Sequence, residues 1–256
     1  MKKIITIGFA LFVWIDLHSQ DVKLKSMDYE MYFGGYEIEQ PLDQIIAVNI
    51  DNTVRFRIEN KTNDSYAFFL DDSYFRFFPD DQFTEEKYGF YNDYFRIQLS
   101  IEKEGKPIDF FAGTYRPDDT FTLKDQLAER DSLLFKKYAI EEFKQNKDSL
   151  MISHFLENHY FILKPGEIRY IKTDISLPEY FSDENTSAIT FFLKPREQYE
   201  VKLRYVMKKE KVLKYLPNHI TEYFKKERIK IFEGELISEK IPLLYVKTGR
   251  EIFEEL

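Results

Sequence analysis

The sequence contains no cysteine. Disulfide bonds and cysteine nucleophiles are therefore excluded, and so is the lipid anchor that bacterial lipoproteins attach to cysteine. Histidine is scarce as well, because His18 lies in the first 20 residues and only His154, His159 and His219 remain. The chain also lacks a Gly-x-Ser-x-Gly segment and a glycine-rich phosphate loop. These absences favour a protein that is not an enzyme and holds no cofactor.

The remaining histidines and acids do not follow a known metal motif. His154 and His159 are five positions apart, about 140° around a helix axis, whereas the pair on a metalloprotease helix is four apart, about 40°. Helix-end or strand-edge positions explain them better. Counting from Asp80, the sixth residue is Glu85, where the helix-loop-helix calcium motif requires glycine. We therefore expect no metal, with a looser calcium site among the acids of residues 71–93 left open.

Acidic side chains outnumber basic ones, 45 to 37, and the formal net charge is −8. Such a chain repels nucleic acids and anionic membrane surfaces. The short basic runs at residues 208–211 and 225–228 are interrupted by acids, which is typical of solvated turns and helix faces. No pair of carboxylates stands out for glycoside hydrolysis among so many. A periplasmic or secreted hydrolase with a carboxylate-based site therefore stays open as the alternative function.

Residues 1–20 have the pattern of a signal peptide. Lys2 and Lys3 precede an apolar stretch of 12 residues, Ile4 to Ile15, which is shorter than the roughly 20 residues of a membrane span. Cleavage after Ser19 or Gln20 would leave residues 21–256 as a single domain; a short uncleaved anchor is the alternative. We expect an exported protein, periplasmic or secreted, that is not a lipoprotein and has no membrane span after signal removal.

A short phrase occurs twice, 30 residues apart. Residues 161–167 read Phe-Ile-Leu-Lys-Pro-Gly-Glu and residues 191–197 read Phe-Phe-Leu-Lys-Pro-Arg-Glu. Gly166 after proline suits a type II turn, which requires φ > 0, whereas Arg196 favours a type I turn. After the second turn, apolar and polar residues alternate through Tyr199, Val201, Leu203 and Tyr205, as in a strand with one buried face. The repeat predicts two consecutive β-hairpins.

Further strands are predicted elsewhere. Val54, Phe56 and Ile58 alternate with arginines, and a polar loop at residues 60–64 leads to a second apolar run at residues 66–70, so these two strands are expected to pair. Gly34-Gly35 is typical of a two-residue hairpin turn. Another alternating stretch comprises Phe95, Ile97, Leu99 and Ile101.

One long segment, residues 118–164, contains neither glycine nor proline. Thr122 with Asp125 forms a capping-box pattern, and apolar residues at helical spacing follow. The spacing predicts a helix over about 123–147. With the strands, it indicates a mainly β fold: an immunoglobulin-like antiparallel β-sandwich with an inserted α-helix at about 122–148.

The sequence around the turns also resembles a known group of proteins. Leu-Lys-Pro-Gly-Glu at residues 163–167, and the ending at residues 232–241, resemble immunoglobulin-like sandwiches of secreted bacterial proteins. A fainter similarity is to small sandwich proteinase inhibitors that share the strand-Pro-Gly-Glu turn. The resemblance covers roughly residues 54–70 and 160–246 and implies a fold and a compartment only.

Residues 71–94 interleave aromatic rings with acids. Most of the phenylalanines are expected to fill the core, while tyrosines offer flat, partly polar surfaces that glycans and proteins bind. The predicted partner surface comprises Tyr88, Tyr91 and Tyr94. The sequence thus predicts a non-enzymatic exported protein that binds a protein or glycan partner in the bacterial cell envelope.

Replacing each of these tyrosines by alanine tests that surface. An exposed ring is expected to cost less than about 1 kcal/mol of stability, whereas a buried ring costs roughly 3–5 kcal/mol. Thermal melts of Tyr88→Ala, Tyr91→Ala and Tyr94→Ala distinguish the two, and large losses at all three positions would place the rings in the core.

Overall fold

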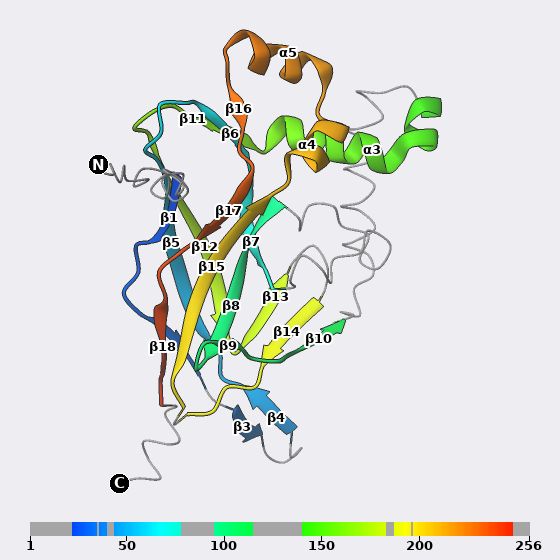
Figure 1. The fold of residues 1–256 in the computed structure, drawn as a ribbon. Helices are drawn as coiled ribbons and strands as arrows, with labels where there is room; N and C mark the ends of the chain where they lie inside the picture. Colours follow the sequence, from blue (N-terminus) through cyan, green and yellow to red (C-terminus); the bar gives the residue numbers. More distant parts are fainter. Residues whose placement is uncertain are drawn as a thin grey trace, which may run out of the picture.

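The structure, a computed structural model, describes residues 22–34, 36–39, 44–77, 95–114, 140–182, 187–195 and 197–247. In the described residues it is mainly β, and its several sheets include a curled half-barrel (Figure 1). The predicted mainly β class is confirmed. The signal peptide lies outside the described residues and stays a prediction.

One three-stranded sheet has the order β1-β5-β12 and is antiparallel throughout. It comprises β1 (Val22–Ser26), β5 (Ile50–Asn60) and β12 (Ile168–Leu177). Val54, Phe56 and Ile58 are fully buried, as their alternation predicts, and the residues between them point outward. This sheet forms the left-hand wall of the molecule in Figure 1.

The largest sheet has the order β2-β18-β15-β8-β7, with β17 and β9 as further partners of β15 and β8. Its strands are β2 (Met31–Phe33), β7 (Asp71–Arg76), β8 (Arg96–Lys103), β9 (Lys106–Pro107), β15 (Tyr199–Met207), β17 (Gly234–Ile237) and β18 (Ile241–Tyr245). The alternation predicted for β15 and β8 is confirmed, because every apolar residue of the two series is buried.

Three smaller sheets complete the described strands. One has the order β11-β6-β16, with β6 (Tyr66–Phe69), β11 (Tyr160–Leu163) and β16 (Lys230–Ile231). A second has the order β10-β14-β13, with β10 (Phe110–Thr114), β13 (Glu179–Ser182) and β14 (Ser187–Phe191). The third pairs β3 (Tyr36–Glu39) with β4 (Gln44–Ala47).

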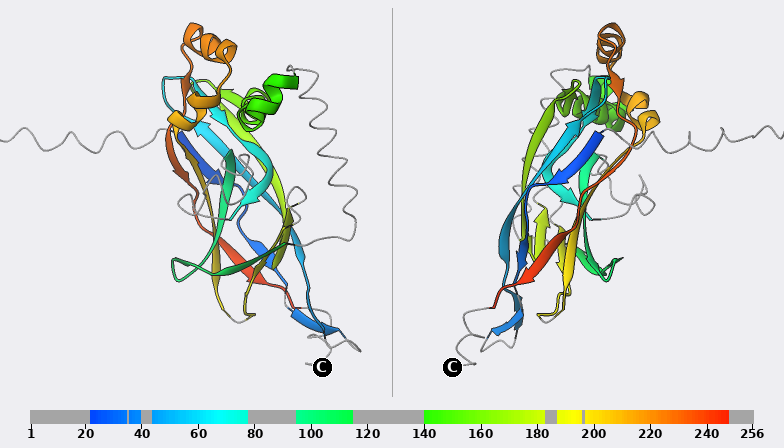
Figure 2. Two further views of the ribbon diagram at one scale, coloured as in Figure 1. Left: turned by 90° about the vertical axis from the view of Figure 1, so that its right-hand side faces the viewer. Right: turned by 60° about the vertical axis from the view of Figure 1, so that its left-hand side comes forward.

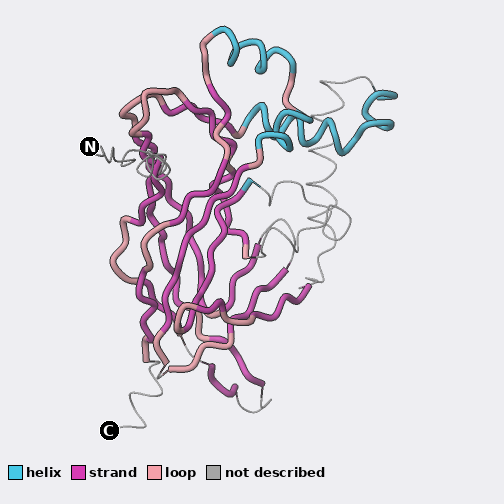
Figure 3. The backbone as a smooth tube through the Cα atoms, in the orientation of Figure 1, coloured by secondary structure: helices cyan, strands magenta, loops and turns pink. Residues whose placement is uncertain are grey.

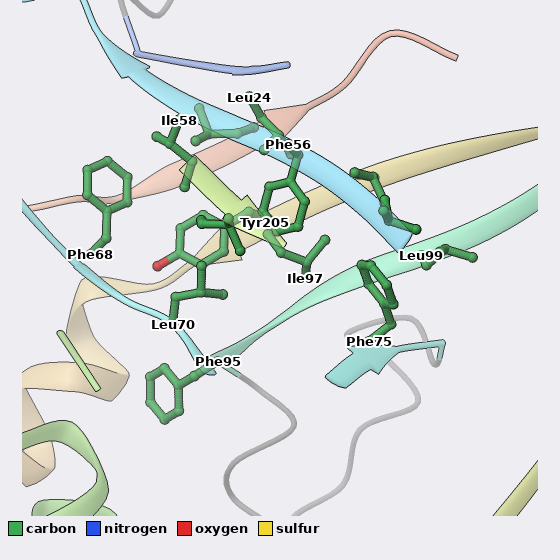
Figure 4. Close-up of a cluster of buried hydrophobic side chains, with 14 of the residues drawn as sticks. Leu24, Phe56, Ile58, Phe68, Leu70, Phe75, Phe95, Ile97, Leu99 and Tyr205 are labelled. Carbon is green, nitrogen blue, oxygen red and sulfur yellow. The ribbon is translucent and has the colours of Figure 1, made fainter. Parts of the chain in front are cut away.

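Apolar side chains from the different sheets meet in one core (Figure 4). Phe56 and Ile58 of β5 face Ile97 and Leu99 of β8 there, and Tyr205 of β15 lies between them. Each buried side chain of this size contributes roughly 1.5–3 kcal/mol of transfer free energy. Burial of these strand faces is therefore the main force that holds the sheets together.

The helices gather at one end of the sheets, opposite the β3–β4 pair (Figures 1 to 3). They are α3 (Ile140–Asn158), α4 (Lys209–Tyr215) and α5 (Asn218–Lys226). The predicted helix over about 123–147 falls largely outside the described residues. In the part that is described, the helix continues beyond its predicted end at residue 147 to Asn158.

The repeated phrase forms turns, but not hairpins. In the first copy the Glu167 N–H donates to the Lys164 carbonyl at 3.0 Å, and Gly166 has φ +79°, so the predicted positive φ is confirmed. The strands on either side of the turn do not pair, however: β11 pairs with β6 and β12 pairs with β5. The predicted hairpin is wrong, because this turn carries the chain from one sheet to another.

The second copy behaves in the same way. The Glu197 N–H donates to the Lys194 carbonyl at 3.1 Å, while β14 pairs with β10 and β13, and β15 pairs with strands of the largest sheet. The lysine N–H is also bonded in each copy. In the first copy the Lys164 N–H donates to the Glu167 carboxylate at 2.7 Å. In the second copy the Lys194 N–H donates to the Tyr199 hydroxyl at 3.0 Å, and this hydroxyl donates to the Glu197 carboxylate.

The predicted pairing of β5 with β6 is wrong for a related reason. Asn60 ends β5 at the point where the chain leaves one sheet for the other, and it lies against the Lys-Pro-Gly-Glu turn. Its N–H donates to the Glu167 carbonyl at 3.0 Å, its carbonyl accepts from Gly166 at 2.8 Å, and its side-chain amide donates to the Leu163 and Asp64 carbonyls at 2.9 and 2.8 Å. Asn60 thus joins the end of β5 to the turn between β11 and β12.

Gly34 also has a different role from the predicted one. β2 pairs with β18 and β3 pairs with β4, so no hairpin joins the strands before and after the two glycines. A Cβ on Gly34 would lie 1.6 Å from the carbonyl oxygen of Val48. The glycine is required by this close backbone approach rather than by a turn.

Gly166→Val is expected to destabilise the protein by about 1–2 kcal/mol, because a β-branched residue is strained at φ +79°. Apart from the chain neighbours, no atom lies within 4 Å of the added Cβ, so the expected cost is backbone strain. Denaturant unfolding of Gly166→Val and Arg196→Val measures the difference. Equal losses at the two turns would contradict the assignment of a positive φ requirement to the first turn alone.

Candidate binding surfaces

The predicted partner residues Tyr88, Tyr91 and Tyr94 lie outside the described residues, so that surface stays a prediction. The described beginning of the same segment is partly core: Phe75 and Phe77 are buried, and the Phe77 ring packs against that of Phe191 with a centroid distance of 5.4 Å. The expectation that phenylalanines of this segment fill the core is confirmed for these two.

The histidines singled out in the sequence lie at the carboxyl end of α3, one of the two positions expected for them. His159 follows the helix, and its Nδ1 is 3.1 Å from the Phe155 carbonyl oxygen. His154 contacts Asn158 one turn on, at 3.3 Å. In the part of the chain that the structure describes, no group of three His, Asp or Glu side chains is arranged to hold a metal ion.

The buried carboxylates of the described residues are paired with cations. Asp71 accepts from Nε of Arg96 at 3.0 Å, and both side chains are almost completely buried. Glu59 lies 2.8 Å from Arg57. Glu102 lies 3.4 Å from Lys202 and 3.2 Å from Lys240. In each case a cation lies beside the carboxylate and compensates its loss of water.

The pKa of Asp71 reflects this balance. Burial alone would raise the pKa, but the Arg96 charge and hydrogen bonds from Ser73 and Arg96 outweigh it, and the pKa is lowered. A lowered pKa keeps this carboxylate ionised, which is the opposite of what a general acid needs.

The outer face of the β1–β5–β12 sheet has a different character. Alternation points most apolar residues of these strands inward and leaves basic residues, one ring and the acids Asp51, Glu59 and Asp174 on the outer side. We call this surface the cationic face; it comprises Lys23, Lys25, Arg55, Arg57, Tyr170 and Lys172.

The strand register places like charges directly opposite one another on this face. Lys25 pairs with Arg57, and Arg57 pairs with Tyr170, so that two cations and a ring form one row across the sheet. In the neighbouring row Arg55 pairs with Lys172. Directly opposed like charges destabilise a sheet. The folded state is thus less stable than the same sheet would be with opposite charges at these positions.

Three carboxylates offset part of the charge. Asp28 bonds Arg55 with a nitrogen–oxygen distance of 2.7 Å, Glu59 bonds Arg57, and Asp174 lies 4.0 Å from Lys172. Within the described residues Lys25 has no carboxylate opposite it, whereas Lys23 stands opposite Glu59 in the strand register. Asp51, exposed on the same face of β5, is a fourth acid. Five cations against four acids leave the face slightly positive on a protein whose net charge is −8.

The sequence pattern does not predict the cationic face. Its cations come from three strands that are far apart in sequence, and no basic run marks it. The alternation of lysine or arginine with apolar residues is visible in each strand, but only the register brings the strands together.

Two further rings are exposed on another sheet. Phe111 and Phe192 are 60% and 64% exposed. Phe111 lies in β10, opposite Thr190 of β14, and Phe192 directly follows the end of β14. The structure therefore exposes aromatic rings outside the segment in which they were predicted.

Comparison with known proteins adds no family. No protein-family model matches the chain, and a search of curated proteins found no match. The resemblance to secreted bacterial sandwiches thus stays an expectation. Among the described helices, none combines the length and the apolar character that a membrane crossing requires.

The Asp71–Arg96 pair makes stability depend on pH. Because the pKa of Asp71 is lowered on folding, its contribution is complete above the unfolded pKa of about 4 and is lost as the pH falls through the folded value. Asp71→Asn removes the negative charge beside the buried Arg96 and is expected to cost about 3 kcal/mol at neutral pH.

Denaturant unfolding at neutral and at acidic pH measures this effect. The stability difference between Asp71→Asn and the unchanged protein should shrink in acid, where Asp71 is itself protonated. Asp109→Asn, at an exposed loop position, is the control and should change stability little at either pH. A difference for Asp71→Asn that does not vary with pH would contradict the assignment.

Proposed function

We propose that this protein is an exported, non-enzymatic binding protein of the bacterial cell envelope, and that it binds a negatively charged partner through the cationic face. The amino-terminal pattern of residues 1–20 supports export. The mainly β architecture and the repeated Lys-Pro-x-Glu phrase support an immunoglobulin-like relationship, which is part of the same proposal.

The observation that carries the proposal is the pairing of like charges on neighbouring strands. Lys25 opposes Arg57 and Arg55 opposes Lys172, although opposite charges at these exposed positions would be more stable. A partner that supplies negative charge removes the repulsion when it binds. The stability lost in the free protein is thereby recovered in the complex.

The buried carboxylates favour binding over the alternative hydrolase. A glycoside hydrolase needs one carboxylic acid with a raised pKa beside a second carboxylate. Here the buried acids Asp71, Glu59 and Glu102 each contact a cation, and the pKa of Asp71 is lowered. These carboxylates hold the fold together rather than forming an acid–base pair.

A double charge reversal tests the proposal. Lys25→Glu with Lys172→Glu converts both like-charge pairs into opposite-charge pairs. We expect this variant to unfold at an equal or higher temperature than the unchanged protein and to lose retention on a carboxylate resin at neutral pH and low salt. The unchanged protein should be retained although its isoelectric point is about 5.3, because the cationic face acts locally.

The matched control is Lys209→Glu with Lys226→Glu, on the exposed surfaces of α4 and α5. It changes the net charge by the same amount but leaves the cationic face intact, so it should still be retained. Equal loss of retention in both double variants would show that net charge alone governs binding and would overturn the proposal.

A further inference from the structure

We propose that the occupant of the cationic face is a linear acidic polysaccharide, one that carries carboxylates on its sugar rings. This inference rests on the proposed function and narrows it to one chemical class. Charge complementarity requires an anionic ligand, and the ring of Tyr170 distinguishes a sugar polymer from other polyanions.

Tyr170 is 58% exposed and lies in the same row as Lys25 and Arg57. An exposed tyrosine among cations offers a flat apolar surface with a negatively polarised face. The C–H bonds on one side of a sugar ring carry partial positive charge and can stack on that face. A sugar carboxylate at the edge of the stacked ring then lies within reach of Arg57, since adjacent strands are about 5 Å apart.

Each of the two strands carries one further cation beside this row. Lys172 follows Tyr170 on the same face of β12, and Arg55 precedes Arg57 on the same face of β5. Alternate residues of a strand are about 7 Å apart, so the face presents successive cations beside one ring. An extended polymer lying along β5 and β12 would therefore meet the ring and one further cation on each strand before it reaches Asp174 and Asp51.

Nucleic acid fits this face less well. Double-stranded DNA carries about one charge per 1.7 Å of its length, and most of the surface that it would approach belongs to a chain of net charge −8. A polysaccharide with wider charge spacing meets less repulsion from that surface. An acidic peptide matches the cations but has no sugar ring to stack on Tyr170.

Isothermal titration calorimetry with polygalacturonate as the probe tests the inference. We expect binding that weakens as salt is added, and no binding of dextran, a neutral polysaccharide. Tyr170→Ala should weaken polygalacturonate binding roughly tenfold, the equivalent of about 1.4 kcal/mol. Tyr170→Phe keeps the ring and should bind like the unchanged protein. Because Tyr170 is exposed, both variants are expected to fold, and a thermal melt checks this.

Polyglutamate and DNA separate failure of this inference from failure of the proposed function. Tyr170→Ala should leave polyglutamate binding unchanged, whereas Lys25→Glu with Lys172→Glu should abolish binding of every polyanion. The polysaccharide inference would be overturned if polyglutamate or DNA bound more tightly than polygalacturonate and Tyr170→Ala did not weaken polygalacturonate binding. The cationic face would then bind another class of polyanion. No binding of any polyanion would overturn the proposed function as well.

Discussion

The side-chain amide of Asn60 is the contact on which the arrangement of the sheets most depends. Its nitrogen donates to two carbonyls, and its oxygen accepts from the N–H and the hydroxyl of Thr62 at 3.0 and 2.8 Å. The amide thus makes all four of the hydrogen bonds available to it, inside the protein, where an unmade bond is expensive. Its partners lie in the loop between β5 and β6 and at the end of β11, beside the turn that leads to β12. The amide therefore fixes β5, β6, β11 and β12 relative to one another.

Other buried polar groups fix the remaining strands in a similar way. Asn52 of β5 accepts from the Tyr32 N–H at 2.7 Å and donates to the Tyr32 carbonyl at 2.8 Å, which holds β2. Thr173 of β12 donates to the Asp72 carbonyl at 2.7 Å, which holds β7. Tyr205 of β15 donates to the Phe69 carbonyl of β6 at 3.0 Å. Apolar burial supplies the free energy, and these bonds select one arrangement of the sheets.

The sequence predicted strand faces well and strand partners poorly. Alternation at Val54, Phe56 and Ile58 identifies the buried side of β5, but it carries no information about which strand lies alongside. Strands that are consecutive in sequence, such as β5 and β6 or β11 and β12, lie in different sheets here, so the predicted pairing of sequence neighbours is wrong. For the same reason the cationic face could not be predicted, because it depends on the register of β1, β5 and β12.

The polar residues of β8 show a second limit of pattern reading. Arg96, Gln98 and Glu102 occupy the positions that alternation assigns to solvent, yet all three are buried. Each is paired: Arg96 with Asp71, Gln98 with Arg204 at 3.1 Å, and Glu102 with two lysines. The partners come from distant parts of the chain, so no local pattern marks a strand that is buried on both faces.

The order in which the largest sheet can form follows from its topology. β2 pairs in parallel with β18, with Met31 opposite Leu243, a separation of 243 − 31 = 212 residues. β18 also borders β15, so that edge of β15 has no partner there until the last strand has been synthesised. Contacts this distant in sequence form slowly, and unpaired strand edges invite aggregation. The sheet is therefore completed only after residues 241–245 have left the ribosome, and until then the chain depends on remaining unfolded or being shielded.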